Sequence, residues 1–413
     1  MMRAAPALHA FAGYGIELEY MIVDRQTLAV MPIADTLLQA AAGGKVSEVD
    51  RGRFGWSNEI VLHLVEIKNA RPDPAFEPLA ADFQAEVSSI NRLLEPMGAR
   101  LMPSAMHPWM NPAAETRLWP HDQAPIYQAY DRIFDCKKHG QANLQSMHLN
   151  LPFANDAEFA RLHAAVRVLL PILPALAASS PIADGKPGGY LDSRMAAYCT
   201  AVQQVPSVIG QVIPDTINSR AEYASQVLAP MYRDIAPLDH DGLLQHEWLN
   251  ARGAIPRFDR NAIEIRVIDV QECPQADLAI AAAATAVIRA LYDDRWSLLT
   301  MQQAISTDRL AKILHACIRD ADQAVIDDAG YLRLLGLSDR QYRAGELWRH
   351  LITRTALNRS TFWAETLHVM LEHGPLARRI LRALGPDCSK TRLHAVYSAL
   401  CDCLETGKMF VDR

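Results

Sequence analysis

The sequence has few cysteines, and their spacing shows no pattern. Seven cysteines among 413 residues are an odd number, which argues against the disulfide framework of a small secreted domain. The tightest pair, Cys401 and Cys403, is separated by one residue, whereas zinc-binding thiols are usually spaced Cys-x₂₋₄-Cys. We therefore expect free, buried thiols in a protein of the reducing cytoplasm.

The sequence also lacks a dominant charge and a long apolar run. Its 41 basic and 47 acidic residues give a net charge of −6, which does not indicate binding to nucleic acid or to an anionic membrane. The longest apolar stretch, from Leu278 to Ile288, is too short to span a membrane, and no sustained apolar segment before Glu17 predicts a signal peptide. With 50% hydrophobic and 21% charged residues, the chain can form a large globular core.

The segment 261–269 carries the strongest local pattern. It alternates as a strand does, which places Glu264, Arg266 and Ile268 on one face and leaves the opposite face wholly apolar. The carboxylate and the guanidinium lie roughly 7 Å apart along such a strand. A carboxylate holds a hard cation and a guanidinium grips phosphate with two N–H groups. This face is therefore compatible with metal and phosphate, and equally with an ordinary surface ion pair.

Two other predicted strands also have one polar face. In 13–24, Glu17 and Glu19 share a face, and their like charges repel unless the face is solvated or a cation lies between them. In 145–153, every second side chain is polar and a proline ends the pattern. The polar residues of that segment are Ser146, His148 and Asn150.

A fourth predicted strand, 61–67, contains an acidic residue within an apolar run. Glu66 interrupts this run, and an acidic side chain is rarely buried unless it is paired or bound to a metal. Glu59 lies seven residues earlier, where the chain enters the strand. His63 falls on the face opposite Glu66, and we interpret it as a packed or partly exposed histidine rather than a ligand.

Together these strands predict an α+β fold built on a curved antiparallel sheet of about six strands. Helices would flank the sheet, and its polar concave face would hold divalent metal and nucleotide. Five carboxylates and one histidine could serve two or three Mg²⁺ ions, or Mn²⁺ in their place, because such ions take a few protein ligands and complete their shell with phosphate. Arg266 would then stabilise the charge of a transferring phosphoryl group.

The same residues carry a resemblance to the glutamate–cysteine ligase superfamily, which includes bacterial carboxylate–amine ligases and is related to glutamine synthetase. The opening strand is similar to a G-[IV]-E-x-E motif, and the two acidic residues seven apart recur in that family. The matching segments, which span most of the first 275 residues, are Gly15–Glu19, Glu59 with Glu66, Ala105–Trp109, His148–Leu151, Ser179–Pro181, Ser193–Met195 and Ile263–Asp269. Each segment is a weak signal, but their order and spacing together are specific.

This resemblance implies a glutamine synthetase-like fold and ATP-dependent amide formation, in which ATP phosphorylates a carboxylate and an amine displaces the phosphate. The substrates would be small molecules, an acidic amino acid or another carboxylate plus an amine. The implied metal ligands are Glu17, Glu19, Glu59, Glu66, His148 and Glu264. The implied nucleotide-binding residues are Arg266, His148, Asn150 and Arg194. The implied catalytic residues are Arg266, Glu264 and Glu59, whereas His107 is expected only to shape a turn.

Three departures from the family pattern leave the substrates open. Ser146 stands where relatives carry the first histidine of a His-x-His pair, and the segments 184–220 and 252–260 do not align clearly with relatives. These differences affect the amine acceptor most and the donor less. Two alternatives therefore remain, a guanidino or carboxylate phosphotransferase and a non-catalytic relative that binds nucleotide or an amino acid.

Helical spacing dominates the rest of the chain. We expect a catalytic unit over 1–300 and a packed helical region over 301–413, which form one continuous domain because no linker separates them. The apolar stripes of the C-terminal helices could belong to the core or to the interface of a homo-oligomer. The predicted helices are 78–94, 156–170, 171–178, 277–299, 307–321, 338–360, 361–372, 376–384 and 390–404.

Overall fold

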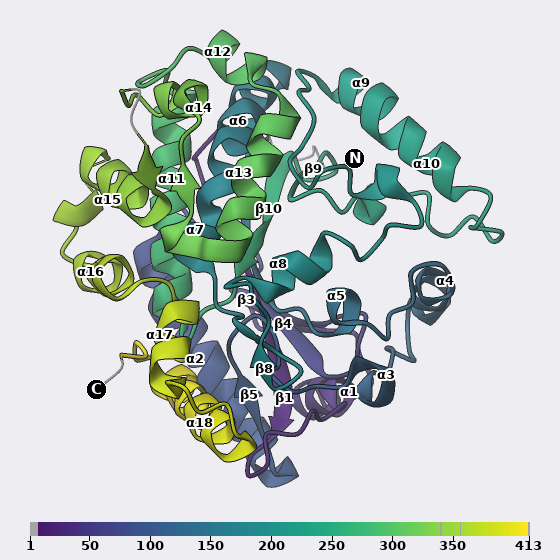
Figure 1. Cartoon of the computed structure of the whole chain (residues 1–413). Helices are drawn as coiled ribbons and strands as arrows, with labels where there is room; N and C mark the ends of the chain where they lie inside the picture. Colours follow the sequence, from purple (N-terminus) through teal and green to yellow (C-terminus); the bar gives the residue numbers. More distant parts are fainter. Residues whose placement is uncertain (1–6, 339–340, 356, 412–413) are drawn as a thin grey trace.

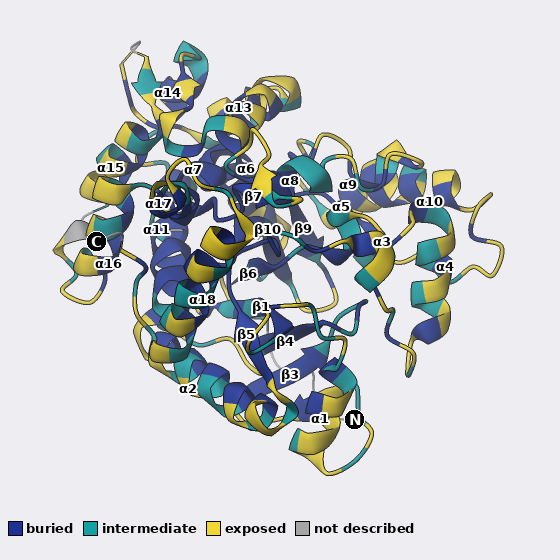
Figure 2. Ribbon diagram, turned by 60° about the horizontal axis from the view of Figure 1, so that its bottom comes forward, coloured by how far each residue is buried: buried dark blue, intermediate teal, exposed yellow. Residues whose placement is uncertain are grey.

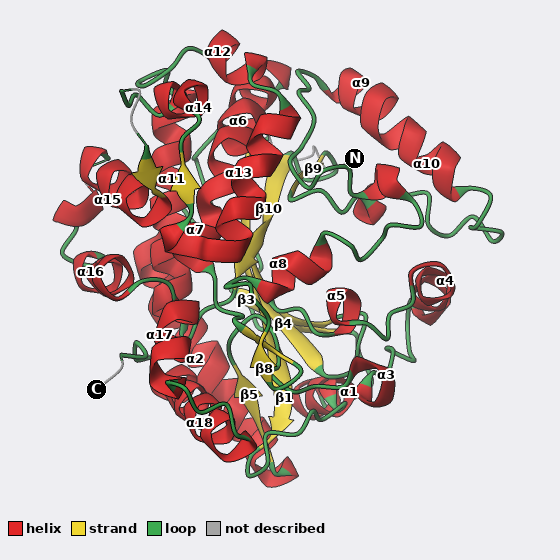
Figure 3. Cartoon of the chain, viewed as in Figure 1, coloured by secondary structure: helices red, strands yellow, loops and turns green. Residues whose placement is uncertain are grey.

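A computed structural model describes residues 7–338, 341–355 and 357–411 of the chain. Its centre is an eight-stranded antiparallel sheet with the order β2-β3-β4-β1-β6-β10-β9, in which β5 also pairs with β1. Helices surround this sheet (Figures 1 and 3), so the α+β prediction is confirmed. The strands are β1 (Gly15–Asp24), β2 (Glu48–Asp50), β3 (Phe54–Asn58), β4 (Leu64–Asn69), β5 (Ala99–Met102), β6 (Ser146–Pro152), β9 (Ala254–Arg257) and β10 (Ala262–Asp269).

The expected number of about six strands was too low. β2, β3, β5 and β9 have three to five residues each, and such short segments show too few alternations to stand out. The strand predicted at 61–67 also begins later, because Val61 forms an isolated bridge with Leu118 and β4 starts only at Leu64. Glu59 consequently lies in the connection between β3 and β4.

The apolar face of the sheet forms the main core with four helical segments. Ile16 and Leu18 of β1, Leu149 of β6 and Ile265 of β10 are fully buried in one cluster with apolar side chains of these helices. Figure 2 shows their buried sides facing the sheet. The segments are α2 (Phe76–Leu94), α6 (Asp156–Leu169), α7 (Leu173–Ala177) and α11 (Pro274–Tyr292).

Two of these helical segments are apolar enough to cross a membrane by length and composition, but the fold buries them. In Asp156–Ala177 and Pro274–Tyr292, 89% and 78% of the apolar window lies inside the protein. Core helices of globular proteins have this pattern. The helix predicted over 277–299 is shorter than expected, because α11 ends at Tyr292 and Asp294 adopts a left-handed φ of 55°.

The C-terminal helices pack on the earlier part of the chain and lie near α2 and α11 (Figure 1). Their apolar stripes belong to the protein's own core: Trp348 and Leu351 join the main cluster, and Tyr397 and Leu400 join a second one with Met21 of β1. The region is not wholly helical, since β11 (Val325–Ile326) pairs with β12 (Tyr342–Arg343). Part of the helix expected at 338–360 lies outside the described residues, and the described helix there is α15 (Ala344–Arg354).

Shorter helices lie around the edges of the sheet, and α9 and α10 are on the side opposite the C-terminal helices (Figure 1). A small hairpin, β7 (Ile182–Ala183) with β8 (Lys186–Pro187), precedes α8. The helices of this set are α1 (Ala34–Ala42), α3 (Pro112–Glu115), α4 (Ala124–Phe134), α5 (His139–Ala142), α8 (Ser193–Tyr198), α9 (Arg220–Tyr223) and α10 (Ala229–Ile235), and the other C-terminal helices are α12 (Leu299–Ala304), α13 (Thr307–Asp320), α14 (Ala329–Leu334), α16 (Ala364–His373), α17 (Leu376–Leu384) and α18 (Lys390–Thr406).

Candidate active site

The strand register brings the predicted polar residues together on one face of the sheet. Directly opposed residues of an antiparallel pair point to the same face. Glu19 of β1 lies opposite Glu66 of β4, and Glu17 of β1 lies opposite His148 of β6. Asn150 of β6 in turn lies opposite Glu264 of β10. Four neighbouring strands therefore contribute to one polar surface.

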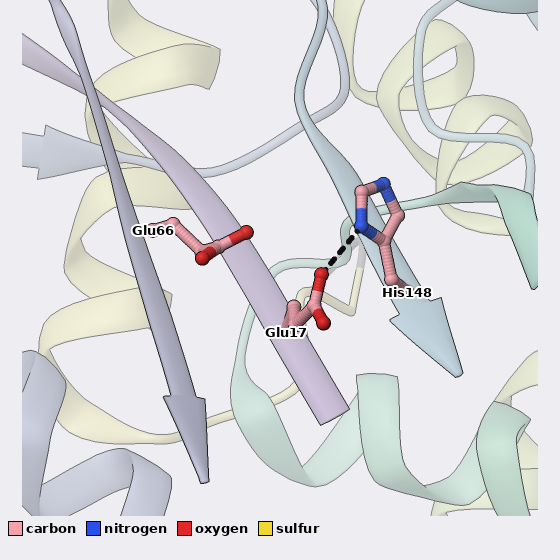
Figure 4. A group of neighbouring side chains, drawn as sticks. All are labelled: Glu17, Glu66 and His148. Atoms are coloured by element: carbon pink, nitrogen blue, oxygen red, sulfur yellow. Dashed lines mark hydrogen bonds and ion pairs between the residues drawn. The ribbon is translucent and has the colours of Figure 1, made fainter. Parts of the chain in front are cut away.

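The acidic side chains of this surface form two groups of oxygen and nitrogen donors. Glu17, Glu66 and His148 make up one group, and Glu19, Glu59 and Glu66 the other, with the donor atoms of each group within 4.8 Å of one another. Figure 4 shows the first group, whose three side chains converge from three strands, with Nδ1 of His148 2.8 Å from Glu17. Glu66 belongs to both groups and lies between them.

These groups line a cavity of about 300 Å³. Of the nine residues predicted for the site, eight are in its wall, and Asn150 lies in the wall of a neighbouring cavity instead. The predicted residues around the 300 Å³ cavity are Glu17, Glu19, Glu59, Glu66, His148, Arg194, Glu264 and Arg266. Ser146 is also in the wall, and its N–H and hydroxyl both donate to Glu19.

Glu264 is held between two arginines rather than within either donor group. Nη2 of Arg266 donates to Oε1 of Glu264 over 2.6 Å, and Nη1 of Arg257 donates to its Oε2 over 3.0 Å. Nδ1 of His148 lies 3.9 Å from Oε1. Its assignment as a metal ligand therefore stays a prediction, while the pair of guanidinium groups beside it forms a site for an anion.

A β-bulge in β10 shapes this end of the cavity and corrects one expectation. Ile265 lies opposite Leu149, but Ile268 lies opposite Met147, so β10 contains one extra residue. A bulge of this kind breaks the alternation of faces and re-aims side chains. The prediction that Ile268 shares a face with Glu264 was wrong: Ile268 is on the apolar side, and Asp269 lies opposite Ser146 on the polar side.

The electrostatics of the cavity follow from many carboxylates in a buried space. Burial, together with the charge of Glu17, raises the pKa of Glu66 to about 7, and burial with the charges of Glu19 and Glu66 raises that of Glu59 well above its usual range. Burial alone would lower the pKa of His148, but the nearby carboxylates raise it to about 9. The cluster therefore stabilises positive charge that is placed within it.

The donor atoms of the cluster fit a hard divalent cation. Carboxylate oxygens are the ligands that Mg²⁺ and Mn²⁺ prefer, and the sharing of Glu66 between the two groups suits a pair of such ions. A phosphate group bound to these ions would face the guanidinium groups of Arg257 and Arg266. Asn150 is in the wall of the neighbouring cavity, and its Oδ1 is buried without a hydrogen-bond partner among the described residues.

Arg194 has a structural role in addition to its place in the cavity wall. Its Nε donates to Oδ1 of Asp269 over 2.5 Å, and both side chains are almost fully buried. Oδ2 of Asp269 accepts from the backbone N–H of Ser179 and from the hydroxyl of Ser180. The Ser-Pro and Ser-Arg segments noted in the sequence thus meet at one aspartate, which fixes Arg194 beside the site.

Asp269→Ala is expected to lower the free energy of unfolding by about 3–5 kcal/mol, because it leaves the buried guanidinium of Arg194 without its partner. Urea denaturation of both proteins measures this difference. Asp241→Ala, which removes an exposed ion pair with Arg132, is the matched control and should change the value by about 1 kcal/mol or less. Equal losses in the two variants would contradict the role given to Asp269.

Three residues of the site were missed in the sequence. Arg257 comes from β9, in a segment that could not be aligned, and its position depends on pairing with β10. Lys68 lies two residues after Glu66 on the same face of β4 and opposite Glu17; the alternation would have shown it if the strand had been extended past residue 67. Tyr198 of α8 lines the cavity and donates to the carbonyl of Ala251, and no local pattern predicts this.

Two other histidines lie outside the walls of this cavity. His107 is fully buried, with Nε2 2.7 Å from the carbonyl of Leu28, and its Nδ1 accepts from the N–H of Trp109. His63 is also fully buried, with Nε2 2.7 Å from the carbonyl of Ala142, and burial lowers its pKa to about 4. His63 is thus packed, one of the two positions expected for it, and His107 lies beside the turn at Pro108 and Trp109.

The chain is similar to several known proteins. A family model described as glutamate–cysteine ligase family 2 matches residues 14–397. An uncharacterised protein of Archaeoglobus fulgidus is 32% identical over 400 residues, which are 96% of this chain and 100% of that protein. A protein of Bradyrhizobium sp. (strain ORS 278) with the provisional name glutamate–cysteine ligase 2 is 27% identical over 288 residues. That match covers 68% of this chain and 62% of the Bradyrhizobium protein.

Two solved structures have a similar fold. The crystal structure of glutamate–cysteine ligase from Francisella tularensis in complex with AMP matches with a TM-score of 0.60 and 13% identity, over 95% of this chain and 89% of that one. A bifunctional glutathione synthetase from Pasteurella multocida matches with a TM-score of 0.55 and 12% identity, over 96% of this chain and 52% of that one. At such low identities the likeness concerns the fold alone.

Proposed function

Because the chain belongs to glutamate–cysteine ligase family 2, we propose that it is an ATP-dependent carboxylate–amine ligase. The observation that carries this proposal is the arrangement of two acidic donor groups that share Glu66, beside a pair of arginines in one cavity. Such a site binds the phosphates of a nucleotide through divalent cations and places guanidinium groups where charge develops during phosphoryl transfer. The structure of the Francisella tularensis ligase with AMP supports nucleotide use by this fold.

The roles of the residues follow from their positions. Glu17, Glu66 and His148 would hold one divalent cation, and Glu19, Glu59 and Glu66 a second; bound cations would neutralise the phosphate oxygens of ATP. Arg266 and Arg257 would contact the phosphoryl group as it passes to the substrate carboxylate. Glu264 orients both guanidinium groups through its two oxygens. An amine would then displace the phosphate and form the amide.

Positioning accounts for most of the rate in such a reaction. The protein has little covalent chemistry to perform, so it holds the reactants close and stabilises charge. The cavity meets this requirement because its acidic groups are buried and the side chains of Ser146 and Arg194 are hydrogen-bonded in place. The identity of the carboxylate and of the amine depends on other parts of the wall, which include Tyr198 and Gln141.

The test is a screen for ADP release across pairs of carboxylates and amines, beginning with glutamate plus cysteine. We expect ADP and phosphate to appear only when both a carboxylate and an amine are present with Mg²⁺. The new amide product is then identified by mass spectrometry. Phosphate transfer to a stable product without an amine would contradict the ligase and indicate a phosphotransferase.

Added Mg²⁺ or Mn²⁺ is expected to stabilise the protein, because a ligand that binds only the folded state raises its free energy of unfolding. The gain is about 2.7 kcal/mol at a concentration of 100 times Kd. Thermal unfolding with and without the cation measures it as a rise in Tm. Glu19→Gln should reduce this rise. An unchanged Tm at high concentrations of both cations would contradict the metal assignment.

A further inference from the structure

A lysine occupies the boundary between the acidic cluster and a second cavity. Lys68 lies on the polar face of β4, opposite Glu17 of β1 on one side and Gly55 of β3 on the other. Its Nζ is 3.2 Å from Oε1 of Glu66 and 3.4 Å from Oε1 of Glu48. Glu66 is the carboxylate that both donor groups share, so Lys68 is an internal counter-ion of the proposed metal site.

The second cavity has about 690 Å³ and adjoins the first at Glu17, which lines both. Lys68 and Asn150 are in the wall of the larger cavity, together with apolar side chains such as Leu8 and Pro72. A space of this volume, whose wall combines apolar side chains with polar and charged ones such as Glu48 and Arg260, can accept a small polar ligand. A ligand that extends from this cavity into the acidic cluster would pass Glu17, which lines both cavities.

The side chain of Lys68 has room to move between the acidic cluster and the second cavity. It is 29% exposed, and its cross-strand neighbour is Gly55, which has no side chain. A Cβ atom at Gly55 would lie 3.7 Å from Cε of Lys68 and 3.2 Å from Oε1 of Glu48, so a larger residue there would confine the lysine. A lysine is a flexible stem with a compact charge, which allows it to change partners and to bind phosphate.

We propose that Lys68 exchanges its partner during ligand binding. When no cation is bound at Glu66, Lys68 pairs with Glu66; when cations and nucleotide are bound, Lys68 contacts the phosphate chain of the nucleotide. This inference rests on the proposed function in that it takes the ligand to be a nucleotide with divalent cations. A cation at Glu66 repels the ammonium group of Lys68, and the negative phosphate chain attracts it. Lys68 therefore opposes binding of metal alone and favours binding of metal with nucleotide, which couples the two events.

Lys68→Met tests this exchange, because it removes the charge and keeps most of the length of the side chain. Mn²⁺ alone is titrated into the protein and followed by electron paramagnetic resonance, and a non-hydrolysable ATP analogue with Mg²⁺ is titrated by calorimetry. We expect Mn²⁺ to bind more tightly and the analogue more weakly than in the wild type. Each change should lie between about 5-fold and 150-fold, the usual range of coupling between sites.

The opposite signs of the two changes separate this role from a structural one. If Lys68 only supported the fold, its replacement would lower the affinity for both Mn²⁺ and the ATP analogue. That result, or no change in either affinity, would overturn the proposal. Lys68→Arg keeps the charge and should restore much of the analogue affinity. Lys45→Met removes an exposed lysine and should leave both affinities unchanged. The Tm of each variant checks that the fold is intact.

These measurements are independent of ligase activity. Opposite shifts in a protein that joins no carboxylate to any amine would support the role of Lys68 and contradict the proposed ligase reaction. Ligase activity combined with unchanged affinities in Lys68→Met would contradict only the role of Lys68. Failure of Mn²⁺ and of the analogue to bind the wild-type protein at all would overturn both.

Discussion

Glu66→Gln is expected to lower the turnover of ATP by about 1000-fold, the largest effect that a single carboxylate of this site can have. Glu66 belongs to both donor groups, so the change weakens two cation sites at once. Metal ions supply several kcal/mol of transition-state stabilisation, and about 4 kcal/mol corresponds to about 1000-fold in rate. ADP release under saturating substrates and Mg²⁺ measures the loss.

The fold should survive this substitution, because Gln has the same shape and relieves the repulsion among the buried carboxylates. We expect the Tm of Glu66→Gln in the absence of cations to equal or exceed that of the wild type. Glu372→Gln, at an exposed ion pair on α16, is the matched control and should keep full activity. ADP release by Glu66→Gln at the wild-type rate would contradict the metal assignment.

Arg266→Ala is expected to lower kcat by at least about 1000-fold, as arginines that stabilise phosphoryl transfer contribute 10³–10⁵ in rate. Its guanidinium is held by Glu264 and by the carbonyl of Asn250 at the wall of the cavity. Burial alone would lower the pKa of Arg266, but the carboxylate of Glu264 keeps that pKa above the usual range. The group is therefore charged and oriented before substrate binds. We expect the affinity for the non-hydrolysable ATP analogue to change by less than about tenfold, since the contact is assigned to the transition state.

Two further variants test this second prediction. Arg266→Lys should recover little activity, because an ammonium group cannot reproduce the planar two-pronged contact. Arg295→Ala removes an exposed arginine and should have no effect. A loss of analogue affinity with an unchanged kcat would show that Arg266 binds the ground state and would contradict its assigned role.

Much of the site could be predicted from the sequence because strand alternation is a local property. The resemblance to the glutamate–cysteine ligase superfamily, which is confirmed by the match over residues 14–397, rested on short motifs of this kind. The paired polar residues of β1, Glu17 and Glu19, show their common face in the sequence itself. The acidic residue of β4 stands out in the same way, because it interrupts an apolar run.

Other parts of the site depend on contacts between distant segments. Arg257 reaches Glu264 only because β9 pairs with β10, and the bulge that places Asp269 on the polar face appears only in the pairing of β10 with β6. Lys68 has a clear position on its strand, but its role depends on Glu48 of the edge strand β2 and on the space beside Gly55. No window of the sequence contains this information.

The sequence by itself determined which side chains are polar, which strand faces they occupy and, through its motifs, the family of the chain. It did so because the period of a strand is set by the backbone alone. Only the tertiary structure decided that Glu66 is shared by two donor groups, that Glu264 lies between two arginines and that Lys68 lies beside Glu66 in the wall of the second cavity. These features arise from the order and register of strands far apart in the chain, which depend on packing of the whole core.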